Sequence, residues 1–190
     1  AKDGDIVLVE IVEQPEFRKQ PIGRVKNVLG AHMAPGMEID IAMQTYDIPH
    51  EWPQDVEVQI VDFGTEVKEG DKVNRVDLRD KAFVTIDGED ARDFDDAVFA
   101  QAMKNGGTRL YVAIADVSHY VAVHSPLDVE ARNRGTSVYF PERVIPMLPE
   151  VLSNGLCSLN PQTDRLALVC EMEVSPLGVV DHFRFMEGII

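Results

Sequence analysis

The residues best suited to chemistry lie between positions 85 and 97, where the chain reads TIDGEDARDFDDA. This acidic loop contains six carboxylates and one arginine in thirteen residues. Two like charges about 5 Å apart repel by roughly 3 kcal/mol at an effective dielectric constant of about 20, so such carboxylates need a counter-charge or must protonate. Magnesium prefers oxygen ligands and is usually held by one or two carboxylates together with a substrate phosphate. The composition of the loop therefore indicates a site for a hard divalent cation.

The segments on either side of the acidic loop are the elements that must position it. Residues 82–86 and 97–100 are apolar and typical of strands, which a merely solvated acidic surface would not need. We expect the first strand to end at Asp87, and Gly88 to permit a tight turn. Three aspartates then open the second strand, namely Asp93, Asp95 and Asp96. The two strand ends would thus direct carboxylates at one point.

Two other interpretations of the acidic loop have different consequences. A solvated acidic surface would hold no cation, whereas a structural cation site would bind calcium and ignore phosphate. A calcium loop of the EF-hand type is excluded, because no glycine stands at its sixth position and no glutamate at its twelfth. Glu89 and Asp90 lie in the turn of the loop, where we expect them to face solvent or to be structural.

The remaining pattern predicts an α+β fold, a mixed and mostly antiparallel sheet with short helices. The strands are expected in two antiparallel hairpins, at residues 96–102 with 110–117 and at residues 166–174 with 179–185. The short helices are expected at residues 36–46, 53–64 and 125–135. The last of these has Ser125 as its cap and Gly135 as its end.

The first part of the chain has a different pattern from the rest. β-branched runs at residues 5–12 and 22–30 predict two strands of a small barrel. The helix that follows them would place Met37, Ile41 and Met43 toward the interior. A barrel remnant followed by a helix is therefore expected here.

The bulk composition limits the classes of function. A formal net charge of −15 argues against a general basic surface for nucleic acid. With 190 residues and 45% hydrophobic residues, the chain can form one domain or two small ones, and it has no membrane-spanning run of about 18 apolar residues. Cys157 and Cys170 lack metal-site spacing and are expected to be free thiols, which suits a cytoplasmic protein. The histidines lack the spacing of metal ligands.

A second candidate site lies at residues 132–143, which combine three arginines with two aromatic residues. Arginine neutralises phosphates, and an aromatic face stacks on any base, so the segment favours binding of single-stranded nucleic acid. The predicted RNA contacts are Arg132, Arg134 and Arg143. The residue types alone favour core positions for Tyr139 and Phe140.

Four stretches of the chain resemble the motifs of a known family. These are residues 87–96, 114–118, 132–141 and 145–150. On them, most of residues 40–190 is similar to the RNB exoribonucleases, the superfamily of ribonucleases II and R. The similarity is greater to the ribonuclease R type, and the motifs are long enough to be specific.

This resemblance implies a hydrolytic 3′ to 5′ exoribonuclease that acts on single-stranded RNA and releases nucleoside 5′-monophosphates. Its cofactor would be magnesium, with manganese as the alternative. Residues 1–34 would form the last strands of a cold-shock, OB-type RNA-binding domain. Residues 35–190 would form the first portion of the RNB nuclease domain.

The resemblance also implies roles for single residues. Asp87 and Asp96 would be direct metal ligands, and Asp93 would complete the metal site. Asp95, at the same site, would be the carboxylate whose loss abolishes catalysis but leaves RNA binding largely intact. Tyr139 would stack near the 3′-terminal nucleotide and help to set the length of the final product, while Phe140 would remain in the core.

The family's nuclease domain continues beyond Ile190 and there supplies a second stacking aromatic residue and a catalytic arginine. We therefore expect this chain to be an excised fragment with little or no exonuclease activity of its own, and the parent protein to be a monomer. The alternative is a non-catalytic RNA-binding or regulatory relative. The presence of all four matched aspartates weighs against that alternative.

Overall fold

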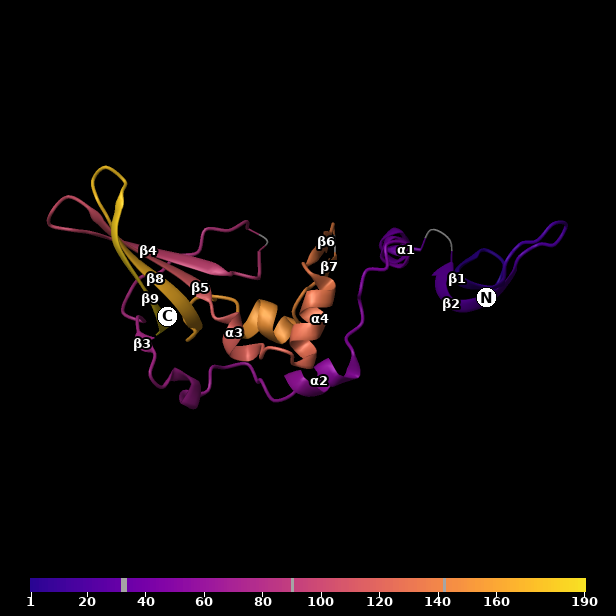
Figure 1. The fold of residues 1–190 in the computed structure, drawn as a ribbon, viewed down its shortest axis with the longest axis horizontal. Helices are drawn as coiled ribbons and strands as arrows, with labels where there is room; N and C mark the ends of the chain where they lie inside the picture. The colour runs from indigo at the N-terminus through magenta and orange to yellow at the C-terminus, as the bar shows by residue number, and fades with distance from the viewer. Residues whose placement is uncertain (32–33, 90, 142) are drawn as a thin grey trace. The chain divides into compact units, whose positions relative to one another are not determined.

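The computed structural model of the chain describes residues 1–31, 34–89, 91–141 and 143–190 (Figure 1). The chain divides into two compact units. The first comprises residues 1–52 and 139–145, and the second comprises residues 53–138 and 146–190. Among the described residues, no helix is long and apolar enough to cross a membrane.

The first unit contains two small sheets. Strands β1 (Asp5–Glu13) and β2 (Ile22–Ala31) form an antiparallel hairpin, which confirms the two strands predicted there. Strands β6 (Val138–Phe140) and β7 (Arg143–Ile145) form the other two-stranded sheet, most of which belongs to this unit.

Helix α1 (Met37–Thr45) follows β2 and buries Met37 and Met43 as predicted. Ile41, however, is 38% exposed, so its predicted inward position is wrong. At about 100° per residue, Met37 and Met43 lie roughly 120° apart around the helix, and Ile41 lies outside the arc between them. The buried face of α1 is therefore centred away from Ile41.

The second unit is built on a five-stranded sheet in the order β3-β9-β8-β5-β4. Its strands are β3 (Val76–Asp77), β4 (Asp96–Ala102), β5 (Thr108–Ala115), β8 (Leu166–Val174) and β9 (Val180–Ile189). Neighbouring strands are antiparallel except β3 and β9, which are parallel. The predicted mixed, mostly antiparallel sheet and both of its predicted hairpins are confirmed.

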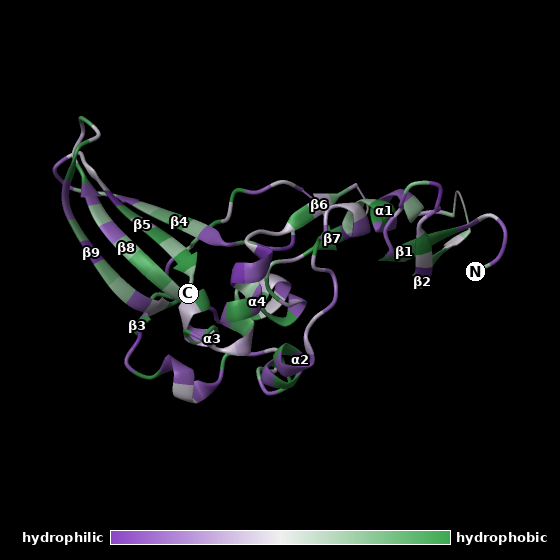
Figure 2. Ribbon diagram, turned by 45° about the vertical axis from the view of Figure 1, so that its right-hand side comes forward, coloured by the Kyte–Doolittle hydropathy of each residue, from purple (hydrophilic) through white to green (hydrophobic). Residues whose placement is uncertain are grey.

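Short helical segments complete the second unit. They are α2 (Gln54–Ile60), η1 (Glu69–Lys72), α3 (Val117–Tyr120), α4 (Pro126–Arg134) and the irregular η2 (Val151–Leu156). Helices α3 and α4 lie beside the end of the sheet at which β5 finishes (Figure 2). The predicted cap of α4 is present, because the Ser125 hydroxyl accepts a hydrogen bond from the Asp128 amide at 3.2 Å. The start of β4, and with it the acidic loop, lies at this same end.

The chain between β3 and β4 crosses one face of the sheet. On one side, the Leu78 amide donates to the Ile189 carbonyl at 2.8 Å. On the other side, Val84 and Val98 exchange two backbone hydrogen bonds of 2.9 Å. The strand predicted over residues 82–86 is therefore wrong, because a segment that runs across the strands cannot pair along the sheet edge. Only this single bridge remains of it.

Phe83 anchors the crossing segment to the core. Its ring centroid lies 6.0 Å from that of Phe99 and 6.4 Å from that of Tyr111. These rings pack on a buried cluster formed by Leu78, Tyr111, Ala113, Ala167 and Val169. Burial of a large apolar side chain contributes about 1.5–3 kcal/mol. The segment that leads into the acidic loop is thus held by packing more than by strand pairing.

A buried ion pair joins the segment before β3 to the residue after β5. Arg75 Nη2 lies 2.6 Å from Asp116 Oδ2, and the two side chains are only 5% and 4% exposed. Asp116 also accepts a hydrogen bond from the Ser118 hydroxyl at 2.7 Å. Burial raises the pKa of Asp116, but the hydrogen bonds from Ser118 and Arg75 lower it more, so that its pKa lies below the usual value.

Replacing Arg75 with methionine should lower the free energy of unfolding by about 3–5 kcal/mol, because the buried Asp116 carboxylate then loses its counter-charge. The depressed pKa of Asp116 also gives the parent a stability that is present above the unfolded-state pKa and lost as the pH falls. Denaturant unfolding at neutral and acidic pH measures both effects. The control is Arg79→Met, which removes the exposed partner of Asp77 and should cost much less. Equal losses in the two variants would contradict this account.

Candidate functional site

The two arms of the acidic loop leave from the bridge between Val84 and Val98. Asp87 lies three residues after Val84, and Asp95 lies three residues before Val98. The charge of Asp87 contributes to the raised pKa of Asp95, so the two arms keep these carboxylates within electrostatic reach of each other.

The second arm of the acidic loop is held by backbone hydrogen bonds. The Leu159 amide donates to the Phe94 carbonyl at 2.8 Å, and the Ala115 amide donates to the Asp95 carbonyl at 2.9 Å. The buried Ser158 hydroxyl also contacts the main chain of this arm. The arm with three of the four predicted ligands is therefore fixed against the end of β5 and against the segment that follows η2.

Asp95 lies near the negative charges of three other carboxylates. Partial burial raises its pKa, and the charges of Asp93, Asp96 and Asp87 raise it further. Three of the aspartates predicted from the sequence are thus close enough to the fourth, Asp95, to act on its carboxyl group. A positive charge beside Asp95 would offset this repulsion.

The four carboxylates are nevertheless not gathered into a closed coordination sphere. Asp87, Asp95 and Asp96 are exposed, and Asp93 is half-buried. Within the described part of the chain, no group of three or more acidic, histidine or cysteine side chains is arranged to hold a metal ion. The assignment of Asp87, Asp93, Asp95 and Asp96 as metal ligands stays a prediction.

The chemistry of this donor set still fits a hard divalent cation. The loop offers carboxylate oxygens, and the mutual repulsion that contributes to the raised pKa of Asp95 is what such a cation would relieve. Glu89 is exposed, as expected for the turn, whereas Asp90 lies outside the described residues.

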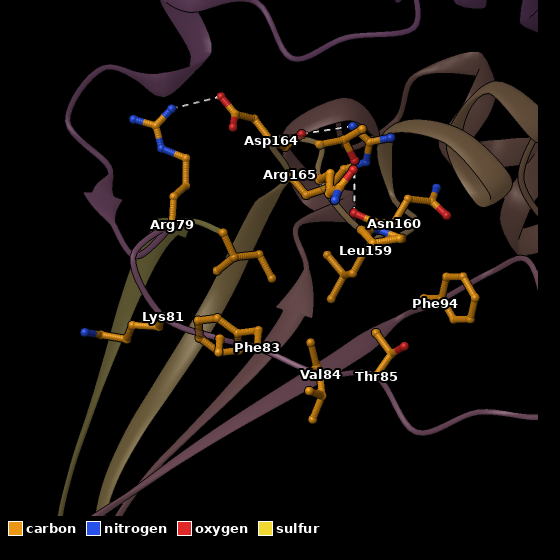
Figure 3. A pocket seen from close by; sticks show the side chains of 16 residues that line it. Arg79, Lys81, Phe83, Val84, Thr85, Phe94, Leu159, Asn160, Asp164 and Arg165 are labelled. Atoms are coloured by element: carbon orange, nitrogen blue, oxygen red, sulfur yellow. Dashed lines mark hydrogen bonds and ion pairs between the residues drawn. The ribbon is translucent and has the colours of Figure 1, made fainter.

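A cavity of about 710 Å³ adjoins the second arm of the loop (Figure 3). Phe94 and Ala97 belong to its wall, together with Phe83 and Leu159. Its charged lining residues are Arg79, Lys81, Asp164 and Arg165. None of the four predicted ligands lines this cavity, so it lies beside the acidic loop and the four carboxylates are not part of its wall.

Two of the predicted RNA-binding arginines lie on α4 and differ in exposure. The Arg132 side chain is 68% exposed, with Nε 3.1 Å from Asp128 Oδ1. The Arg134 side chain is 3% exposed, with Nε 2.8 Å from Glu130 Oε1 and Nη1 3.1 Å from the Pro146 carbonyl oxygen. The structure therefore gives Arg134 an internal role in place of the phosphate contact predicted for it, because it faces the interior with its helical i,i+4 partner.

Tyr139 and Arg143 lie in the β6–β7 sheet. Tyr139 is 64% exposed, so its ring is accessible to a base, whereas its neighbour Phe140 is half-buried. Arg143 Nη1 lies 3.1 Å from Asp40 Oδ1, and both of these side chains are partly exposed. Both predicted RNA contacts are thus at the surface of the first unit.

Ser158 is the residue of the site that sequence reasoning missed. It is fully buried, and its hydroxyl reaches the acidic loop across more than sixty positions of sequence. The available signal was a single polar residue in the apolar run Leu156-Cys157-Ser158-Leu159, because a buried hydroxyl needs hydrogen-bond partners. The sequence did not indicate which partners these were.

Comparison with known proteins finds two family matches. Residues 75–190 match the RNB domain, and residues 1–53 match the cold shock domain. The domain boundary predicted between residues 34 and 35 stays a prediction.

Individual relatives cover the whole chain. Ribonuclease R of Escherichia coli (strain K12) is 58% identical over 190 residues, which are 100% of this chain and 23% of that protein. Mycoplasma genitalium RNase R in complex with double-stranded RNA has a TM-score of 0.89 at 36% identity, covering 98% of this chain and 33% of that chain. A yeast pseudonuclease has a TM-score of 0.72 at 18% identity, covering 98% of this chain and 24% of that chain, which shows a likeness of fold alone.

The chain thus spans 23% of the length of several curated relatives that it matches. The match to Escherichia coli ribonuclease R spans all 190 residues, and so includes the acidic loop. Because the RNB match covers more than half of its residues, this chain belongs to the RNB domain family.

Proposed function

We propose that the protein containing this chain is a monomeric hydrolytic exoribonuclease that degrades single-stranded RNA from its 3′ end to nucleoside 5′-monophosphates. Magnesium is the proposed cofactor, with manganese as the alternative. The observation that carries the proposal is the presence of four aspartates in one loop at the start of an RNB domain, where the charges of three of them raise the pKa of the fourth, Asp95. The relatives named ribonuclease R, one of them solved with bound RNA, support RNA as the substrate.

The residues that would hold the ion are Asp87, Asp93, Asp95 and Asp96. When bound, magnesium lowers the pKa of a coordinated water and offsets charge on the scissile phosphate. The chain's own contribution is to keep the carboxylates in place. The hydrogen bonds from Leu159 and Ala115 fix the backbone at Asp95, so its carboxylate projects from a defined point.

Accessible side chains would bind the RNA itself. An exposed aromatic ring such as that of Tyr139 stacks on any base, and guanidinium groups such as those of Arg132 and Arg143 neutralise phosphates. These contacts are independent of base identity. They therefore suit an enzyme that degrades RNA of any sequence.

A non-catalytic RNA-binding relative is the alternative function. The yeast pseudonuclease illustrates that a protein of this fold need not be a nuclease. All four aspartates expected of an active enzyme are present here. For this reason we favour catalysis, and the Asp95 variant below decides between the two.

Asp95→Asn in the full-length protein should reduce RNA degradation by about two orders of magnitude or more, because a metal site supplies several kcal/mol and each 1.4 kcal/mol is tenfold in rate. RNA affinity should stay near that of the parent. Both are measured with a labelled single-stranded RNA, by product release and by equilibrium binding. Asp181→Asn, on β9 at the opposite end of the sheet, is the matched control and should behave as the parent. Degradation by Asp95→Asn at the parent rate would refute the enzymatic role of this residue.

Tyr139→Ala should lengthen the final product of digestion, because the last few nucleotides then lose a stacking partner. Loss of about 1–3 kcal/mol per stacked base corresponds to roughly 5- to 150-fold weaker binding of short oligonucleotides. Gel analysis of end products measures the change. Tyr46→Ala removes another exposed ring of the first unit and is the control. An unchanged product length in Tyr139→Ala would exclude the stacking role.

Residues 1–190 expressed alone should show little or no magnesium-dependent digestion of single-stranded RNA. The described carboxylates do not form a closed metal site by themselves. The full-length protein assayed in parallel provides the reference rate. Clear processive digestion by the short chain would show that the machinery within these residues is sufficient.

A further inference from the structure

We propose that Ser158 is a positioning residue for the acidic loop. Its hydroxyl holds the backbone on both sides of Asp93 and so keeps the carboxylates of the second arm in place for the cation. This inference rests on the proposed function of the loop. It assigns Ser158 no contact with substrate or metal.

The hydrogen bonds of Ser158 carry the proposal. The Phe94 amide donates to Ser158 Oγ at 3.1 Å, and Ser158 Oγ donates to the Arg92 carbonyl at 2.8 Å. A hydroxyl has one donor hydrogen and two acceptor lone pairs, so it can make both bonds at once. The two backbone groups flank Asp93 directly. One side chain thus sets the peptide planes on either side of a predicted ligand.

The surroundings of Ser158 make it a fixed support. Its side chain is 0% exposed, and its amide donates to the Gly155 carbonyl at 3.1 Å. Its carbonyl accepts hydrogen bonds from Arg165 Nε at 2.8 Å and from the Asn160 amide at 2.8 Å. Arg165 is itself only 6% exposed, so the residue that holds the Ser158 carbonyl is buried as well. The hydroxyl therefore has little freedom to move with the loop.

The adjacent contacts extend the same clamp. The next residue, Leu159, donates its amide to the Phe94 carbonyl at 2.8 Å. Ser158 and Leu159 together engage three polar groups of the loop backbone on the two sides of Asp93, namely the Arg92 carbonyl, the Phe94 amide and the Phe94 carbonyl. Within the described part of the first arm, the contact between the Ala91 amide and the Gly88 carbonyl is local to the loop. The hydrogen bonds from Ser158 and Leu159 instead connect the second arm to a segment that is remote in the sequence.

A serine with a purely structural role would affect stability and turnover differently from a serine that positions the loop. Its loss would lower the stability of the unit and leave the turnover of the folded protein unchanged. A displacement of about 1 Å in a catalytic group can instead cost about 100-fold in rate. The two roles are separated by measuring the folded protein.

The test uses Ser158→Ala in the full-length protein, with Ser153→Ala as the matched control. Ser153 lies in the same segment, and its hydroxyl contacts the Asn154 side chain. In Ser158→Ala, amide hydrogen exchange at residues 92–95 should accelerate by about tenfold or more, while exchange in β5 stays unchanged. The kcat for single-stranded RNA should fall by about tenfold or more, the KM should change by less than about threefold, and the magnesium midpoint should rise. Ser153→Ala should match the parent in each respect.

Two results would overturn the proposal. Unchanged exchange at residues 92–95 would show that the hydroxyl does not restrain the loop. Faster exchange with parental kcat and magnesium midpoint would show that the restraint is irrelevant to the chemistry. Ser158→Cys keeps the volume and weakens both hydrogen bonds, so it provides the same test if the alanine variant does not fold. Failure of the proposed function is detected separately by an active Asp95→Asn, since the exchange measurement does not depend on activity.

Discussion

The concentration of four aspartates within ten residues of chain is the constraint that the acidic loop must accommodate. Partial burial and the neighbouring charges of Asp93, Asp96 and Asp87 raise the pKa of Asp95, so the ionised form of this carboxyl group is disfavoured at its position. Such a loop would relax into solvent if its backbone were free. The contacts around it oppose that relaxation, and a divalent ion would turn the repulsion into binding energy.

The fold supplies this restraint from both sides of the loop. The first arm arrives across the sheet face, anchored by Phe83 against Phe99 and Tyr111, and reaches β4 at the Val84 bridge. The second arm is hydrogen-bonded to the end of β5 and to the buried segment at Ser158. Three of the four carboxylates remain open to solvent, namely those of Asp87, Asp95 and Asp96, and Asp93 is half-buried. Rigid backbone and accessible carboxylates are thus combined in one loop.

Local patterns in the sequence predicted the local structure well. Apolar, strand-like runs predicted β4 and β8, and the Ser-Pro start with a glycine end predicted α4. The features that were missed depend on contacts between distant residues. Residues 82–86 have the composition of a strand but cross the sheet. Ile41 lies outside the buried face of its helix. The Arg134 side chain is buried and forms an ion pair with Glu130. The acidic loop could be located from the sequence because charge density is visible there, whereas the contacts that Ser158 makes with this loop are visible only in three dimensions.

The most direct test of the central claim is a crystal structure of the full-length protein with manganese and a non-hydrolysable single-stranded RNA. The account predicts an anomalous difference peak with carboxylate oxygens from at least two of Asp87, Asp93, Asp95 and Asp96 at about 2.0–2.6 Å, beside a phosphate of the RNA. A fully occupied RNA channel with no metal at the loop, and with these carboxylates pointing apart, would contradict it.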